Sequence, residues 1–146
     1  MAALPLPVRD GVGPSCVALP EDGDWPTIAE FLVQRFAAIP RATWVARIEA
    51  GDVVDEHGQR VTHARPYQPR LRVYYYRALD AEPVIPFQEQ VIHQDAHLLV
   101  VDKPHFLPVT PVGKYVQQSL LVRLKRALGL DQLAPLHRID RETAGI

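Results

Sequence analysis

The sequence predicts an α+β fold in two successive parts, and three observations support this. Apolar residues recur every three to four positions on either side of Pro40, which predicts two short amphipathic helices. Runs rich in valine, isoleucine and tyrosine follow, one at 70–77 and others after residue 90, and they predict strands. The stretch 78–90 holds two prolines among acidic residues, which is typical of a linker. We therefore expect a small module of two helices and short strands, followed by a second part that contains strands and a helix.

The first part opens with residues 1–23, which are rich in proline and glycine, show no period and are expected to form a mostly irregular leader. Asp24 then has the position of a helix N-cap, with Pro26 inside the first turn, and Pro40 ends the helix. Its apolar face would consist of Ile28, Phe31, Leu32, Phe36 and Ile39.

A second helix is predicted from Arg41 to Ala50 and is ended by Gly51. Trp44, Val45 and Ile48 would share one face of it. A short strand at 52–54, a turn at 56–59 and the β-rich run at 70–77 complete a module that spans 24–77.

The second part, 91–146, begins with two predicted buried strands, one around Ile92 and one at 98–101. Ser119 has the position of an N-cap for a helix whose apolar residues are Leu120, Leu121, Leu124 and Leu128, and Gly129 marks its end. The basic residues of this helix, Arg123, Lys125 and Arg126, are expected on a solvated outer face.

The composition excludes several classes of protein. Of the 146 residues 47% are hydrophobic, yet no stretch approaches the ~20 apolar residues that span a bilayer, and the N-terminus lacks the apolar core of a signal peptide. The single cysteine, Cys16, excludes an internal disulfide and a four-cysteine zinc site, which favours the cytoplasm. His93 and His97 are four residues apart, but in a strand that separation is ~13 Å, so no metal site is expected.

The formal net charge of -1 argues mildly against nucleic-acid binding, but the charge is unevenly distributed. Residues 24–77 carry eight arginines against six acidic residues, and residues 85–146 carry seven basic against six acidic groups. This modest excess supports a local contact surface on each part.

The last ten residues place one carboxylate, Asp140, between Arg138 and Arg141. Two neighbouring guanidinium groups would favour its ionised form and could also bind phosphate oxygens in a two-pronged geometry. An ionised carboxylate can act as a nucleophile at neutral pH. On charge pattern alone, an aspartate between two arginines is more usually part of a surface ion-pair cluster.

The amino-acid sequences of two segments resemble those of a known family. His137–Gly145, HRIDRETAG, resembles the HRLDRxTSG signature of the RluA-type pseudouridine synthases, with Ile139 for leucine and Ala144 for serine. Upstream, the segment 91–104, VIHQDAHLLVVDKP, is similar to the segment that opens the catalytic domain of that family. In the following turn, His105 and Phe106 replace the small residues that the family usually has.

The resemblance implies that Asp140 attacks a target uridine in RNA, so that the glycosidic bond breaks and the freed uracil rejoins through carbon 5. Arg138 matches the position that helps to displace the target base from its stack, which is required because a carboxylate cannot reach a stacked nucleotide. Together with Arg141 it would contact RNA. The family needs no metal, redox group or nucleotide cofactor.

Two short helices, a glycine, the GDVV segment and a hairpin also resemble the αL RNA-binding module that many RNA-modifying enzymes carry. That resemblance implies that Arg41, at the start of the second helix, and Arg47, further along it, contact RNA. The alternative is a small cap domain whose arginines are solvated.

The resemblance implies a catalytic domain with a mixed sheet, and in the family this domain continues well beyond the aspartate loop. We therefore expect the chain to be an incomplete and inactive pseudouridine synthase, composed of the leader 1–23, the αL-like module 24–77, the linker 78–90 and the N-terminal portion 91–146 of the catalytic domain. Its partner would be ribosomal or transfer RNA, and the complete protein would be a monomer. The alternative from another class is an RNA-binding module without catalysis.

Overall fold

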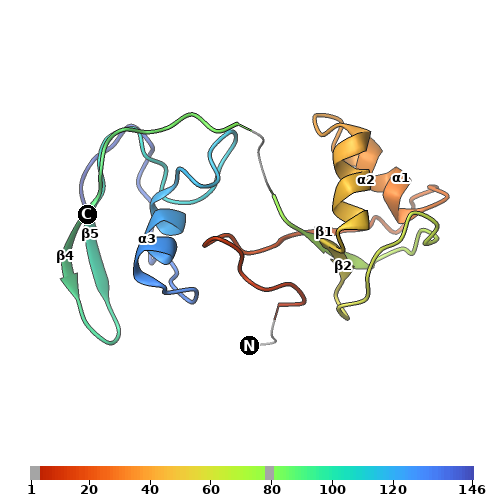
Figure 1. The fold of residues 1–146 in the computed structure, drawn as a ribbon, viewed down its shortest axis with the longest axis horizontal. Helices are drawn as coiled ribbons and strands as arrows, with labels where there is room; N and C mark the ends of the chain where they lie inside the picture. The colour runs from red at the N-terminus through yellow and green to blue at the C-terminus, as the bar shows by residue number, and fades with distance from the viewer. Residues whose placement is uncertain (1–3, 78–80) are drawn as a thin grey trace. The chain divides into compact units, whose positions relative to one another are not determined.

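A computed structural model of the chain describes residues 4–77 and 81–146 (Figure 1). These residues form two compact units, the first made of 4–7 and 13–77 and the second of 8–12 and 81–146. The first unit contains β1 (Ser15–Ala18), α1 (Ile28–Arg35), α2 (Arg41–Glu49), β2 (Val53–Asp55) and β3 (Arg72–Tyr75). The second contains β4 (Gln90–Gln94), β5 (Leu99–Asp102) and α3 (Leu120–Leu128). The α+β class is confirmed, but within the described residues both sheets are antiparallel and a mixed sheet is not seen.

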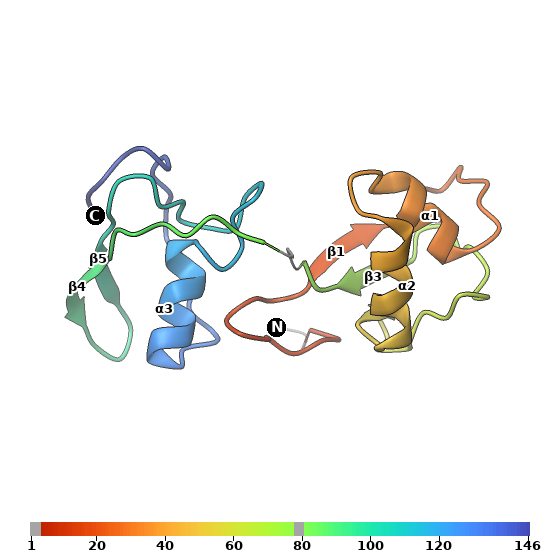
Figure 2. The ribbon, with the colours of Figure 1, turned by 45° about the horizontal axis from the view of Figure 1, so that its top comes forward.

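The sheet of the first unit has the order β1-β3-β2, and α1 and α2 pack against it (Figure 2). Phe31 and Trp44, one from each helix, are buried with Val53 and Val73 from the strands in a single hydrophobic core. The leader was expected to be mostly irregular, and this is wrong for Ser15–Ala18, which pair with β3. A local pattern could not reveal this strand, because its partner lies more than fifty residues further along the chain.

The first helix begins later than predicted. Thr27, not Asp24, is the N-cap. Its backbone is extended, and its side-chain oxygen accepts a hydrogen bond from the Glu30 N–H at 3.2 Å. The helix ends at Arg35, so Ile39 lies outside it, although Ile39 still packs against the core. The second helix is confirmed within one residue, and Gly51 follows it with a φ of 77°.

A buried carboxylate organises the turn after β2. Asp55 is 1% exposed and accepts hydrogen bonds from Arg65 Nη2 at 2.7 Å, from the His57 N–H at 2.9 Å and from the Gln59 N–H at 2.8 Å. Burial opposes ionisation of this group, but the bonds from Arg65, Gln59 and His57 outweigh it and hold the pKa of Asp55 below its usual range. Asp55 is therefore a structural anion of the first unit.

The second unit contains an antiparallel hairpin, β4–β5, with a bulge between Val91 and His93. Asp95 closes its turn by accepting the N–H groups of His97 and Leu98, both at 2.8 Å. These strands were predicted to be buried, and this is wrong: all of β4 is exposed, Ile92 by 54%. The apolar residues of β5 are half-buried, because the described residues of α3 and nearby loops cover only part of the hairpin.

The third helix agrees with its predicted bounds, and Gly129 ends it in the left-handed conformation with a φ of 66°. Arg123 was expected on the solvated face but is buried. Its guanidinium donates to the carbonyl oxygens of Ile85 at 2.6 Å and Phe87 at 2.8 Å, and it pairs with Glu89 at 3.1 Å. Ile85, Phe87 and Glu89 of the predicted linker are thus bound to α3. Residues 78–80 of that linker lie outside the described part of the chain.

The short segment 8–12 also belongs to the second unit. A side chain at Gly11 would come within 2.8 Å of the Val122 carbonyl oxygen of α3, and Gly11 has a φ of 75°. Only glycine allows both this conformation and this close approach. Within residues 4–77 and 81–146, no helix is long and apolar enough to cross a membrane.

Candidate active site

The loop that carries Asp140 is attached to the end of β5 by the backbone. The N–H of Lys103 donates to the Gly145 carbonyl oxygen at 2.8 Å, and the N–H of Gly145 donates to the Lys103 carbonyl oxygen at 3.0 Å. Two reciprocal bonds of this kind are a minimal antiparallel bridge. They fix one end of the loop 137–146 relative to the hairpin.

The side chain of the same lysine binds the middle of the loop. Lys103 is 1% exposed, and its Nζ donates to the carbonyl oxygens of Leu107 at 2.7 Å, Pro104 at 3.0 Å and Arg141 at 3.2 Å. Burial lowers the pKa of Lys103, while the nearby Glu142 acts in the opposite direction. One ammonium therefore holds both the turn 103–107 and the backbone next to Asp140.

Asp140 itself is exposed. Its carbonyl oxygen accepts the Thr143 N–H at 3.1 Å, which closes a turn at 140–143. Among the described residues, none forms a hydrogen bond or an ion pair with its carboxylate. The ion-pair cluster that was the alternative interpretation of this loop is therefore not formed through Asp140, whose carboxylate is left accessible to a ligand.

Arg141 does not turn toward Asp140. Its guanidinium forms an ion pair with Glu142 at 2.8 Å, donates to the Tyr115 hydroxyl at 3.4 Å and lies 5.7 Å from the centre of the Tyr115 ring. The N–H of Glu142 and the Arg141 guanidinium together hold the pKa of Glu142 below its usual range. Arg141 is thus positioned by protein groups, whereas Arg138 is exposed and has no such contact with a described residue.

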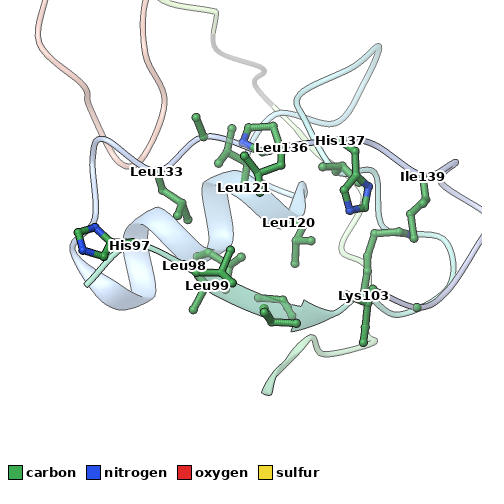
Figure 3. Close-up of a pocket in the computed structure, with 18 residues that line it drawn as sticks. His97, Leu98, Leu99, Lys103, Leu120, Leu121, Leu133, Leu136, His137 and Ile139 are labelled. Atoms are coloured by element: carbon green, nitrogen blue, oxygen red, sulfur yellow. The ribbon is translucent and has the colours of Figure 1, made fainter. Parts of the chain in front are cut away.

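An apolar cavity of about 260 Å³ lies beside this loop, between the hairpin and α3. Figure 3 shows Leu98 and Leu99 from the hairpin, Leu120 and Leu121 from α3, and His137 and Ile139 from the loop around it. His137 lines the cavity, although its side chain is exposed. Asp140, Arg138 and Arg141 do not line the cavity, so the chemistry predicted for the loop lies outside it.

The other two predicted RNA contacts belong to the first unit. Arg41 is 58% exposed and forms an ion pair with Glu30, with its two nitrogens 2.6 and 2.9 Å from the two carboxylate oxygens. This pairing raises the pKa of Arg41 and lowers that of Glu30. Arg47 lies over the Trp44 ring, 5.0 Å from its centre. Both arginines belong to the first unit, whereas Asp140 belongs to the second.

The described residues contain no cluster of histidine, cysteine, aspartate or glutamate suited to a metal ion. Sequence reasoning missed the parts played by Lys103, Tyr115 and His105 around the loop. A signal for Lys103 was present, because a lysine directly after a strand of apolar residues must either reach solvent or find buried acceptors.

Comparison with known proteins gives the following matches. An uncharacterized RNA pseudouridine synthase of Synechocystis is 36% identical over 117 residues, which cover 80% of this chain and 40% of that protein. RNA pseudouridine synthase 5 of Arabidopsis thaliana is 26% identical over 156 residues, covering 98% of this chain and 42% of that protein. The tRNA pseudouridine(31) synthase of Saccharomyces cerevisiae is 25% identical over 139 residues, which cover 82% of this chain and 34% of that protein. No protein-family model matches the chain.

Over most of its length the chain is therefore homologous to RNA pseudouridine synthases, and the predicted family is confirmed by homology. The chain spans less than half the length of these relatives.

Proposed function

We propose that this homologue of RNA pseudouridine synthases takes part in the isomerisation of uridine to pseudouridine in structured RNA, with Asp140 as the nucleophile. The observation that carries the proposal is an accessible carboxylate, without a partner among the described residues, on a loop that is fixed at Arg141 and Gly145 through Lys103. Homology over most of the chain supports the reaction type. The substrate would be ribosomal or transfer RNA in the cytoplasm, and the low cysteine content supports that compartment.

The proposed reaction conserves every atom of the nucleotide. A carboxylate oxygen of Asp140 forms a transient covalent bond to the target uridine, and the bond between ribose C1′ and N1 of the base breaks. The uracil rotates, and its C5 bonds to C1′. The proton on C5 is then lost, N1 gains a proton, and Asp140 is released.

The loop anchors prepare the carboxylate for this step. A nucleophile must be held within about 3 to 3.5 Å of the reacting atom, so a loop free to move would lose much of its effect. Lys103 restricts that movement on the C-terminal side of Asp140, through its bonds to Arg141 and Gly145. The exposed Arg138 is available to occupy the space that an extruded uridine leaves, which offsets part of the cost of unstacking, a few kcal/mol.

Arg41 and Arg47 are proposed to bind the RNA backbone through the first unit. The exposure of Arg41 at the first residue of α2 supports this, although a phosphate must displace Glu30 or bind beside it. The alternative function, RNA binding without catalysis, uses the same two arginines but assigns no chemical role to Asp140.

The decisive experiment uses a strain of the source organism that lacks the gene. The strain is complemented with the parental gene or with Asp140→Asn, and pseudouridines in its ribosomal and transfer RNA are mapped by carbodiimide labelling. Asparagine keeps the shape of the side chain without its charge. We therefore expect at least one site that the parental gene restores and Asp140→Asn does not.

Asp131→Asn is the matched control, because Asp131 is also an exposed carboxylate but lies outside the loop. It should restore modification fully. If Asp140→Asn restores every site that the parental gene restores, Asp140 is not the nucleophile. If the parental gene itself restores none, the non-catalytic alternative is favoured.

A further inference from the structure

In the turn that follows β5, the exposed aromatic residue Phe106 has an unfavourable backbone conformation. Phe106 has a φ of 65°, a region that residues with a side chain rarely adopt, and its side chain is 47% exposed. A glycine would adopt this conformation freely. A bulky aromatic residue therefore destabilises the turn locally without burying its ring, which points to a role for the ring outside the fold.

Phe106 is part of a small aromatic surface. Its ring centre lies 6.1 Å from that of Phe87, with the planes tilted by 40°, and 6.0 Å from that of His105, with a tilt of 45°. Phe87 is 49% exposed as well. We name these three residues, Phe87, His105 and Phe106, the aromatic surface. Because its rings are tilted rather than stacked face to face, their faces remain open to a flat ligand.

Two contacts fix the aromatic surface to the loop that carries Asp140. The Nδ1–H of His105 donates to the Glu142 carbonyl oxygen at 2.7 Å. The Nζ of Lys103 donates to the carbonyl oxygens of Leu107 and Arg141, which follow Phe106 and Asp140 directly in the chain. The aromatic surface and the proposed nucleophile therefore share one anchor and keep a defined relative position.

We propose that the aromatic surface, with Phe106 at its centre, stacks against an unpaired RNA base that neighbours the target uridine. This rests on the proposed function, since extrusion of a uridine exposes the faces of the adjoining bases. Aromatic side chains bind such faces in single-stranded RNA, and removing one ring weakens binding by roughly 5- to 150-fold per base. The exposed Arg138 on the neighbouring loop provides positive charge for an adjoining phosphate.

The test uses three substitutions at one position. Phe106→Gly removes the ring and relieves the backbone, so the fold should be as stable as the parent or more stable. Phe106→Leu keeps an apolar side chain and the strained backbone without an aromatic face. Phe106→Trp keeps an aromatic face and should retain binding.

Binding is measured by fluorescence anisotropy with a labelled uridine 12-mer and with a labelled blunt RNA duplex, alongside a thermal melt of each variant. We expect Phe106→Gly and Phe106→Leu to weaken binding of the uridine 12-mer by roughly 5- to 150-fold while changing duplex binding less than twofold. Equal affinity of the parent and Phe106→Gly for the 12-mer would overturn the proposal.

In that case, two further measurements identify what the ring does instead. If Phe106→Gly lowers the melting temperature and leaves affinity unchanged, the ring packs against protein. If it changes only the oligomeric state in size-exclusion chromatography, the ring contacts a second copy of the chain. The proposed function fails separately, through the Asp140→Asn complementation, since RNA stacking could be confirmed even if Asp140 is not the nucleophile.

Discussion

Replacing Lys103 by methionine tests whether one buried ammonium positions the Asp140 loop. Methionine keeps a long apolar side chain but offers no donor to the three carbonyl oxygens that Lys103 Nζ contacts. The bond to Leu107 is buried, and a bond from a charged donor of this kind contributes about 1.5 to 3 kcal/mol. Water can partly replace the donor at the acceptors on Pro104 and Arg141, which are only part-buried.

The ammonium also costs free energy to bury, and this is the effect that lowers the pKa of Lys103. The two effects partly cancel, so we expect Lys103→Met to loosen the loop by a net amount of about 2 kcal/mol. If the loop opens locally, that corresponds to roughly thirty-fold faster hydrogen exchange at the backbone amides of residue 103 and Gly145.

Amide exchange of position 103 and Gly145 followed by NMR is the suitable assay. Both tryptophans, Trp25 and Trp44, lie in the first unit, so their fluorescence in a urea titration serves as an internal control that should not change. Lys114→Met is the matched variant, because Lys114 is exposed. If exchange of the Gly145 amide is the same in Lys103→Met, Lys114→Met and the parent, Lys103 does not hold this loop.

The remaining predictions concern both units. Asp55→Asn should destabilise the first unit by about 3 kcal/mol in urea titrations followed by tryptophan fluorescence, since it breaks a buried ion pair. Because the pKa of Asp55 is lowered in the folded state, its contribution to the stability of the first unit is complete above the ordinary carboxyl pKa and is lost as pH falls through the folded pKa. If the parent and Asp55→Asn unfold in acid at the same pH, this reasoning is contradicted. Gly11→Ala should release the segment 8–12 from α3 at a cost of about 1 to 3 kcal/mol, measured by amide exchange, whereas Gly13→Ala has open space and should be silent. Changing Arg41 and Arg47 together to alanine should reduce the salt dependence of RNA binding by about 0.7 to 0.9 logarithmic units per lost phosphate contact, and an unchanged slope would favour the cap-domain alternative.

Local signals were sufficient for much of the fold and for the family. The period of apolar residues and the positions of Pro40 and Gly51 predicted α2 within one residue, and Gly129 predicted the end of α3. These features depend on neighbours in the chain, which is why they can be recognised without a structure. The start of α1 was missed because Asp24 and Thr27 are both acceptable caps, and the backbone conformation selects between them.

The order of residues in HRIDRETAG determined the family and the candidate nucleophile, and homology agrees with the family. Sequence could not determine where the long side chains of this loop point. Arg141 contacts Glu142 and Tyr115 rather than Asp140, and Lys103 reaches carbonyl oxygens on two separate segments. Such partners are chosen by contacts between parts of the chain that are far apart in sequence, because a buried charge must find whatever acceptors the folded backbone brings to it. For the same reason only the tertiary structure revealed that β1 pairs with β3, that Arg123 is buried and that Phe106 remains exposed beside the loop of Asp140.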